Sequence, residues 1–326
     1  MIDPALTPSA IVTHLDQFVI GQEEAKRTLA VAVYTHYRRL GIQAEMRLDK
    51  SNILLVGPSG SGKTLICNTL ANFLDVPFVT SDATVLAQSP YPGEEITTIL
   101  ESLIEKAQGN LASAERGIIF IDEVDKLKTQ PGSTSNGERV QQALLKITEG
   151  STVRVGEHLL DTSGILFICG GAFVGIENIM SRTHSFGFVV TEEGTSQSVL
   201  DRLNARIKPT DLLEFGLIPE FTGRLPIVAR LNSLSKSMLV RVMIEPQNSL
   251  YRQFRAIFAS EGVTLAIAPR VFEEIAEIAF EYKTGARSLR GIFEELLTPV
   301  MYHLPDHREI KRVEIRSLFE EAKYIS

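Results

Sequence analysis

Cysteine is scarce in this chain, and two kinds of segment are missing from it. Its 326 residues include two cysteines, Cys67 and Cys169, and both have apolar neighbours. This pattern favours reduced thiols in a core over a disulfide or a metal site, and we expect no zinc. The sequence contains no run of about 18 apolar residues and no basic segment that leads into an apolar one. We therefore expect a cytoplasmic protein with no membrane partner.

Positive charge is in deficit as well. The chain has 33 Lys and Arg against 40 Asp and Glu, a formal net charge of −7. This acidic balance argues against a general nucleic-acid surface, and we expect no nucleic-acid partner. The apolar fraction of 44% over 326 residues can instead supply the cores of one large globular domain and a smaller companion.

The most informative stretch reads Gly-Pro-Ser-Gly-Ser-Gly-Lys-Thr and follows the apolar run 52–56. It fits the phosphate-binding pattern G-x-x-x-x-G-K-[ST], for which about one chance match is expected in a hundred chains of this length. Its glycines let successive N–H groups turn toward a triphosphate, and the helix that follows adds its positive end. We predict an ATP-binding loop made of Gly57, Pro58, Ser59, Gly60, Ser61, Gly62, Lys63, Thr64 and Leu65.

Side chains around this loop have individual roles. We expect Lys63 to reach the β- and γ-phosphates and the hydroxyl of Thr64 to ligate Mg²⁺. The apolar segment 117–121 ends in Asp122 and Glu123. Such a segment is typical of a parallel strand buried on both faces, which tolerates acids only at its open end. Asp122 is predicted to hold Mg²⁺ and Glu123 to polarise the attacking water, although the pair could instead cap the next helix.

Five further residues have two interpretations each. Val19 and Ile20 form an apolar elbow that could pack on an adenine ring or belong to an ordinary core. Tyr91 stands between two prolines, in a stiff turn that either exposes it or lets it pack. Arg224 could stabilise a neighbouring subunit's γ-phosphate or form a surface salt bridge. Arg287 lies opposite the apolar stripe of its helix and could face a nucleotide or solvent.

A polar segment at 232–235 suggests a linker that divides the chain. Residues 1–231 are then predicted to form a large ATPase domain, and residues 232–326 a small, mostly helical lid domain with a short strand. Apolar strands alternate with helices in the first part, which predicts an α/β fold with a parallel sheet flanked by helices. In the second part, we expect helices at about 237–260, 269–282 and 286–302 and a strand at 313–315.

Taken together, these stretches resemble the ClpX family of AAA+ proteins, hexameric unfoldases that feed proteins into the ClpP peptidase. The resemblance covers essentially all of the chain and is carried by segments 18–40, 57–64, 117–127, 140–150, 165–173, 215–228 and 284–290. It implies a P-loop AAA+ domain with a lid, and an ATPase that uses ATP and Mg²⁺. The resemblance further implies that the chain assembles with copies of itself into a ring. Its other partners would be unfolded or tagged protein substrates and a ClpP-type peptidase.

The resemblance also implies roles for single residues. Val19 and Ile20 would flank the adenine, Arg224 would reach into the neighbouring subunit, and Arg287 would be the sensor-2 arginine. Tyr91 would be the aromatic residue of the substrate pore loop. The sensor-1 position falls at 169–171, where no polar side chain occurs.

The loops that would touch substrates or partners depart from the family pattern. The pore loop is Pro90-Tyr91-Pro92-Gly93, which keeps the aromatic residue but places prolines beside it. A second pore loop, around 130–138, is short, and residues 149–161 lack the family's Arg-Lys-His insertion. The tripeptide that docks on ClpP corresponds best to Phe186, Gly187 and Phe188, and we find no counterpart of the family's N-terminal zinc module.

Two functions follow from this pattern. The first is an ATP-dependent protein unfoldase and translocase, the ATPase subunit of a ClpXP-like protease. The second is a non-proteolytic remodelling chaperone or regulatory subunit that does not couple to ClpP, which the altered loops favour. A DNA-directed motor is disfavoured by the acidic balance and by the lack of a basic helix-turn-helix.

Overall fold

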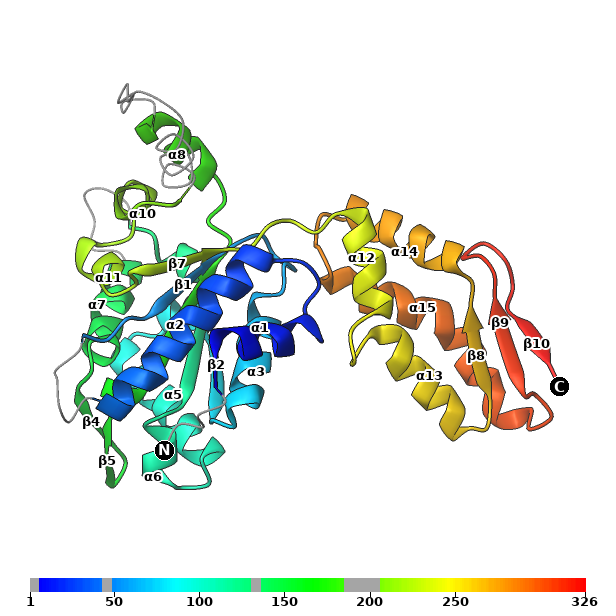
Figure 1. Cartoon of the computed structure of the whole chain (residues 1–326), viewed down its shortest axis with the longest axis horizontal. Helices are drawn as coiled ribbons and strands as arrows, with labels where there is room; N and C mark the ends of the chain where they lie inside the picture. The colour runs from blue at the N-terminus through cyan, green and yellow to red at the C-terminus, as the bar shows by residue number, and fades with distance from the viewer. Residues whose placement is uncertain (1–5, 43–48, 130–135, 185–205) are drawn as a thin grey trace. The chain divides into compact units, whose positions relative to one another are not determined.

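The computed structural model describes residues 6–42, 49–129, 136–184 and 206–326 (Figure 1). The chain forms two compact units. Unit 1 comprises Met1–Ile11, Glu24–Gly57 and Cys67–Arg230, and unit 2 comprises Val12–Glu23, Pro58–Ile66 and Leu231–Ser326. Most of the predicted phosphate loop therefore belongs to unit 2, together with the Val19–Ile20 elbow. None of the helices in the described residues is long and apolar enough to cross a membrane.

Unit 1 is built on a five-stranded sheet with the order β2-β3-β6-β1-β7, in which every pairing is parallel. Its strands are β1 (Ile53–Val56), β2 (Phe78–Asp82), β3 (Ile118–Asp122), β6 (Leu166–Gly171) and β7 (Ile227–Arg230). They are rich in apolar and β-branched residues, and β1, β3 and β6 are buried almost throughout. A parallel sheet covered by helices on both faces requires such strands. The predicted α/β fold is confirmed.

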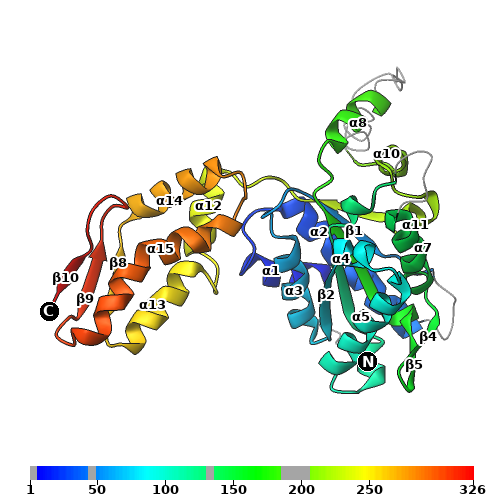
Figure 2. The ribbon, with the colours of Figure 1, turned by 180° about the vertical axis from the view of Figure 1, so that it is seen from behind.

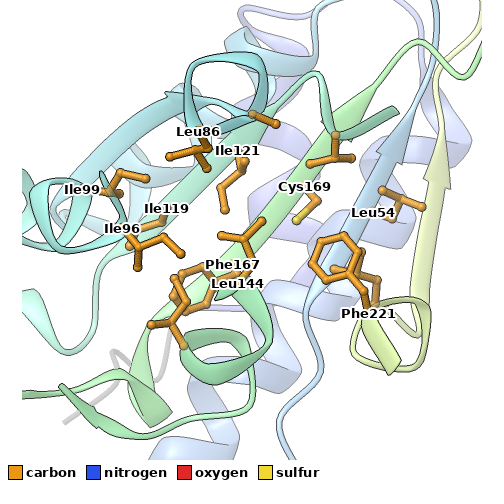
Figure 3. Close-up of a cluster of buried hydrophobic side chains, with 14 of the residues drawn as sticks. Leu54, Leu86, Ile96, Ile99, Ile119, Ile121, Leu144, Phe167, Cys169 and Phe221 are labelled. Atoms are coloured by element: carbon orange, nitrogen blue, oxygen red, sulfur yellow. The ribbon is translucent and has the colours of Figure 1, made fainter. Parts of the chain in front are cut away.

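Helices cover this sheet. The described helices that lie wholly or partly in unit 1 are α1 (Pro8–Asp16), α2 (Glu23–Ile42), α3 (Lys63–Leu74), α4 (Ala83–Gln88), α5 (Pro92–Lys106), α6 (Leu111–Ala114), α7 (Asn136–Thr148), α8 (Ile176–His184), α10 (Pro209–Phe215) and α11 (Pro219–Gly223). On one face, Ile119 and Phe167 pack with Leu86 of α4, Ile96 of α5 and Leu144 of α7 (Figure 3). Helix α2 crosses the strands on the other face (Figures 1 and 2). Full burial of each such side chain stabilises the fold by about 1.5–3 kcal/mol.

A short hairpin stands apart from the main sheet. Strands β4 (Thr152–Val155) and β5 (His158–Asp161) are antiparallel, and Val155 pairs with His158. Only Gly156 and Glu157 remain for the turn, and Gly156 has the positive φ of 57° that tight hairpin turns need. The hairpin leaves no place between β4 and β5 for a longer inserted loop.

Three basic side chains hold the 3₁₀ turn η2 (Thr162–Gly164) that follows the hairpin. Lys50 Nζ, Arg39 Nη2 and His36 Nε2 lie 2.7, 2.7 and 3.0 Å from the carbonyl oxygens of residues 162, 163 and 164. Because a carbonyl oxygen only accepts, His36 must donate from Nε2, and its buried Nδ1 has no hydrogen-bond partner among the described residues. Burial, and then the nearby charges of Arg39 and Lys50, lower the pKa of His36 to about 3.

Unit 2 packs four helices against a three-stranded sheet. The helices are α12 (Lys236–Ile244), α13 (Leu250–Ser260), α14 (Pro269–Glu281) and α15 (Arg287–His303), and the strands are β8 (Thr264–Ile267), β9 (Arg312–Ile315) and β10 (Lys323–Ile325). Two short 3₁₀ helices, η1 (Val124–Leu127) in unit 1 and η3 (Leu304–Asp306) here, complete the elements used below. Strand β9 lies between β8, which is parallel to it, and β10, which is antiparallel. The strand predicted at 313–315 is thus the centre of a small sheet.

The single helix predicted at about 237–260 is wrong. Helix α12 ends at Ile244, and α13 begins only at Leu250. Pro246 lies between them, where a proline lacks the N–H that a helix needs and clashes with the preceding turn. The hydroxyl of Ser249 donates to the carbonyl of Ile244 over 3.1 Å, which satisfies one of the last acceptors of α12.

The buried His36 predicts a dependence of stability on pH. An unfolded histidine takes up a proton below its ordinary pKa of 6.5, whereas folded His36 stays neutral down to about 3. The unfolded state therefore binds more protons in this window, and the free energy of unfolding falls as the pH falls. Between pH 6 and pH 5, we expect the unmodified chain to lose roughly 1 kcal/mol more than His36→Gln, as measured by urea unfolding. Equal losses in both proteins would contradict the neutral, buried His36.

Candidate functional site

The carboxyl edge of the unit 1 sheet carries the start of the phosphate loop and the paired acids. Strand β1 ends at Val56 and β3 at Asp122, with β6 between them. Parallel strands deliver their carboxyl ends to one edge, which is where ligands bind in such sheets. The backbone N–H of Gly57 donates to the carbonyl of Gly171 over 3.1 Å, so the loop begins anchored to β6.

The loop after Gly57 has the backbone of an anion-binding nest. Gly60 and Gly62 have positive φ angles of 73° and 102°, and α3 begins directly after them at Lys63. Among the described residues, no acceptor receives the backbone N–H of Gly60 or of Gly62. The buried hydroxyl of Ser61 also has no hydrogen-bond partner there. Backbone N–H groups and a hydroxyl that lack hydrogen-bond partners suit a phosphate ligand, which the sequence predicts at this loop.

The first turn of α3 holds the three remaining loop residues. Lys63 is 8% exposed, and its Nζ donates to the carbonyl of Pro58 over 3.2 Å. This contact folds the lysine side chain over the loop. Thr64 and Leu65 are both exposed. The structure thus places the predicted phosphate-binding lysine inside the nest and the predicted Mg²⁺-ligating hydroxyl at its solvent side.

Asp122 and Glu123 end the neighbouring strand. Oδ1 of Asp122 accepts the backbone N–H of Glu123 over 2.9 Å. The backbone of Glu123 is in the left-handed helical region, with φ 60° and ψ 28°. This conformation costs a residue with a side chain about 1–2 kcal/mol. Glu123 precedes η1, yet its side chain makes no capping hydrogen bond. The carboxylate of Glu123 is therefore not used to cap the next helix.

The space around these acids explains why β6 ends in glycines. A Cβ at Gly170 would lie 3.2 Å from Oδ1 of Asp122, and one at Gly171 would lie 2.6 Å from Oδ1 of Asp125. Asp125 is 5% exposed, and its Oδ1 accepts the backbone N–H of Ala172 over 3.2 Å. A side chain does not fit at either glycine, because the ring of Phe120 would lie 2.7 Å from a Cβ at Gly170, and the ring of Phe173 would lie 2.7 Å from one at Gly171.

The cysteines lie next to this edge but remain unreactive. Both Cys67 and Cys169 are free and buried. Burial, and then the charge of Asp122, raise the pKa of the Cys67 thiol well above its usual range. Burial raises the pKa of Cys169 to about 12. Both are neutral core thiols, as their apolar surroundings predicted.

Within unit 2, the turn before α15 contacts the phosphate loop directly. The backbone N–H of Ala286 donates to the carbonyl of Gly60 over 3.2 Å, and a Cβ at Gly60 would collide with the carbonyl oxygen of Thr284. Arg287, the first residue of α15, is exposed and follows Ala286 immediately. Its guanidinium makes no hydrogen bond or ion pair within the described part of the chain. The structure thus brings Arg287 to the loop's side of unit 2.

The elbow before α2 also belongs to unit 2. Val19 and Ile20 are 4% and 7% exposed. Such burial suits a core position and an adenine contact alike. The next residue but one, Gln22, was not singled out from the sequence, yet its buried side-chain amide bonds to the backbone of Asn232 and of Ser61.

Arg224 forms the salt bridge that one of its two interpretations predicts. Its Nη2 and Nε lie 2.7 and 2.9 Å from Oε1 of Glu149, and both side chains are about half exposed. The Nδ2 of Asn52, which is fully buried, holds the backbone carbonyl of Arg224 over 3.1 Å. Sequence analysis missed Glu149 and Asn52, since neither belongs to a recognisable motif. The backbone of Arg224 is thus fixed by the hydrogen bond from Asn52, whereas its side chain is held by the half-exposed ion pair with Glu149.

Tyr91 is exposed, in a loop whose backbone is fully committed. Its side chain is 64% exposed, which settles its two interpretations in favour of exposure. Its N–H donates to the hydroxyl of Ser89, and its carbonyl accepts the N–H of Glu94. Pro90 and Pro92 on either side have fixed φ angles and no N–H. Of the other predicted loops, Phe186, Gly187, Phe188 and residues 130–135 lie outside the described residues.

Comparisons with known proteins match both parts of the chain. The family described as "AAA domain (Cdc48 subfamily)" matches residues 48–228, and that described as "C-terminal, D2-small domain, of ClpB protein" matches residues 234–316. Proteins named "ATP-dependent Clp protease ATP-binding subunit ClpX" from Borrelia duttonii and Treponema denticola are each 43% identical to this chain. These alignments span 94% and 92% of this chain and 76% and 77% of the relatives. A Methylococcus capsulatus protein named "ATP-dependent Clp protease ATP-binding subunit ClpX 3" is likewise 43% identical, over 94% of this chain and 78% of its own length.

The contact between the phosphate loop and the turn before α15 can be tested by two alanine substitutions. Both Gly60 and Gly62 have positive φ, so alanine at either position costs about 1–2 kcal/mol of backbone strain. A Cβ at Gly62 meets no atom within 4 Å, whereas one at Gly60 collides with Thr284. We expect Gly60→Ala to lower the free energy of unfolding by about 1–3 kcal/mol more than Gly62→Ala in nucleotide-free protein. Equal losses in a denaturant titration would show that the loop and turn do not touch.

Proposed function

This chain belongs to the ClpX family of AAA+ ATPases, and on that basis we propose that it uses ATP hydrolysis to unfold and thread protein substrates. The observation that carries the proposal is the complete hydrolytic set. The nest at Gly60 and Gly62 leads into Lys63, and strand β3 of the unit 1 sheet ends in Asp122 and is followed by Glu123. The relatives' name, an ATP-binding subunit of an ATP-dependent protease, supports the same activity.

Each residue of this set has one task in the proposed reaction. The N–H groups of the loop and Lys63 would hold the phosphates, and Thr64 and Asp122 would hold Mg²⁺, which would supply positive charge to the phosphates. Glu123 orients and polarises the attacking water, a task for which its carboxylate is not engaged in capping η1. In this proposal Val19 and Ile20 contact the adenine, and the guanidinium of Arg287, the first residue of α15, binds the phosphates.

A ring completes the site in this proposal. The large domain is residues 1–231 and the lid domain residues 232–326, in a homo-oligomer that we take to be a hexamer. Arg224 serves the nucleotide of the neighbouring subunit. Its pair with Glu149 is about half exposed, and such pairs contribute only about 0–1 kcal/mol, so the guanidinium can leave Glu149 readily. The two free, buried cysteines suit a reducing cytoplasm.

A second candidate function is a remodelling chaperone or regulatory subunit that works without a ClpP-type peptidase. The observations that favour it lie in two loops. The β4–β5 hairpin closes in a two-residue turn, Gly156-Glu157, and the backbone around Tyr91 is fixed by prolines and hydrogen bonds. Both features change the surfaces that would receive a substrate while they leave the hydrolytic set unaltered. The two candidates differ in whether an unfolded substrate is degraded.

Replacing Glu123 by Gln tests the hydrolytic assignment. The amide cannot act as a base, so we expect ATP turnover to fall by about 10²–10⁴ while ATP binding persists. Phosphate release and equilibrium binding of a fluorescent ATP analogue measure the two effects. Glu101→Gln, which changes an exposed carboxylate on α5, is the matched control and keeps turnover. Normal hydrolysis by Glu123→Gln would remove Glu123 from the reaction.

Threading past Tyr91 is tested with a compact fluorescent protein that carries an unstructured tail. ATP-dependent loss of its fluorescence, reduced about tenfold or more in Tyr91→Ala, is the expected result, on the scale of losing an aromatic anchor. Val85→Ala trims another exposed apolar side chain, on α4, and should leave the rate unchanged.

A ClpP-type peptidase added to the same reaction separates the two candidate functions. Degradation of the reporter identifies the proteolytic subunit, and unfolding without degradation identifies the remodelling chaperone. An unmodified chain that hydrolyses ATP but never unfolds the reporter would contradict both.

A further inference from the structure

Gln22 joins two backbone segments of unit 2 through one side chain. Its Oε1 accepts the N–H of Asn232 over 2.8 Å, and its Nε2 donates to the carbonyl of Asn232 over 2.8 Å. The same Nε2 lies 3.4 Å from the carbonyl oxygen of Ser61 in the phosphate loop. The glutamine is 6% exposed. A buried amide that is fully used in this way holds its partners in one geometry, because leaving any of these groups unpaired costs about 1–3 kcal/mol.

The backbone at Gln22 is strained. Gly21 and Gln22 have consecutive positive φ angles of 67° and 62°. Glycine or asparagine adopts this conformation more readily than glutamine does. Strained residues persist where the surrounding contacts over-determine them, and they concentrate at functional sites. An asparagine side chain is one methylene shorter than glutamine, so the longer side chain supplies the reach that three contacts need.

The bond to Ser61 acts on the group that faces the phosphate. The carbonyl of Ser61 and the N–H of Gly62 belong to the same peptide unit, which is planar. The direction of the Gly62 N–H is therefore set by whatever holds the Ser61 oxygen. Since no described acceptor receives that N–H, a phosphate can orient it, and the oxygen must then follow.

The bonds to Asn232 act on the segment between β7 and α12. Strand β7 ends at Arg230 and α12 begins at Lys236, with the hydroxyl of Ser235 accepting the N–H of Met238 as the cap of α12. Both backbone groups of Asn232 are committed to Gln22. Rotation of the backbone at Asn232 must either break these two hydrogen bonds or move Gln22.

We propose that Gln22 is a positioning residue that couples the orientation of the Ser61–Gly62 peptide to the conformation of the segment at Asn232. Phosphate binding fixes the peptide, the peptide fixes the Gln22 amide, and the amide fixes Asn232. Gln22 touches neither the phosphates nor the water, and acts only through these two backbone segments. The proposal rests on the ATPase function proposed above, in which the segment at Asn232 is the linker between the domains.

The test compares three variants. Gln22→Gly removes the side chain and its three contacts, and the relief of the positive φ offsets part of the stability that is lost with them. Gln22→Glu keeps the acceptor for the N–H of Asn232 but replaces the donor by an oxygen that faces two carbonyls. Gln17→Ala is the matched control, because the exposed Gln17 also reaches the 231–326 part of unit 2, through its hydrogen bond to Gln247.

Two readouts separate coupling from structure. The first is the KM and kcat of ATP hydrolysis. The second is the distance between spin labels attached at Glu101→Cys and Ala256→Cys, two exposed positions, with and without ADP. The native cysteines are buried and do not interfere. In both Gln22 variants we expect kcat to fall about tenfold with little change in KM, and the ADP-dependent change in distance to disappear. Gln17→Ala should match the unmodified chain in both.

The outcomes distinguish this proposal from the proposed function. Gln22→Gly that turns over ATP and responds to ADP like Gln17→Ala would overturn the coupling role while the ATPase stands. A rise in KM alone would also overturn it, because Gln22 would then act on binding. An unmodified chain that binds ADP and changes its label distance but hydrolyses no ATP would contradict the proposed function, and the distance readout would still decide the role of Gln22.

Discussion

In the predicted phosphate loop, several carbonyl oxygens are held by the protein, while the N–H groups of Gly60 and Gly62 have no acceptor among the described residues. Ala286 holds the oxygen of Gly60, Gln22 holds that of Ser61, and Lys63 lies on that of Pro58. Each peptide plane fixes its N–H opposite to its oxygen. Ala286 and Gln22, which are far from the loop in the sequence, therefore help to set its backbone, and a glycine is needed at position 60 because a Cβ there would collide with the carbonyl oxygen of Thr284.

The sheet of unit 1 sets where the loop starts and which acids stand beside it. Strands that are buried on both faces admit polar side chains only at their ends, so Asp122 and Glu123 lie at the carboxyl edge where β1 also ends. The glycines that end β6 also contribute to this edge of the sheet. They leave space for Asp122 and Asp125, and the carbonyl of Gly171 receives the N–H of Gly57. One row of parallel strands thus positions the acids and the first anchor of the loop.

Sequence patterns predicted those parts of the molecule whose chemistry is local. The predicted phosphate loop and the apolar strand before Asp122 follow from residue types at fixed spacings, and the structure has the predicted sheet. Pro246 was overlooked as a helix break because the apolar period continues across it. Asn52 and Glu149 could not be found, since an amide or carboxylate that binds a distant backbone or arginine leaves no periodic or motif signal. Gln22 lies in the segment 18–40 that carries the family resemblance, but its contacts with Ser61 and Asn232 could not be predicted from that segment. Their roles depend on which segments the fold brings together.

The hydrolytic and substrate-facing parts of the chain are constrained in different ways. The nest is held by side chains and turns that a bound phosphate can influence, through the Ser61–Gly62 peptide. The loop at Tyr91 has no such freedom, because both neighbours are prolines and its own N–H and carbonyl are already bonded. Tyr91 can therefore change its position only when α4 and α5 move as rigid bodies, and not through a change in the conformation of the loop. Under the proposed threading function, the force on a substrate would therefore depend on how rigidly those helices are coupled to the nucleotide.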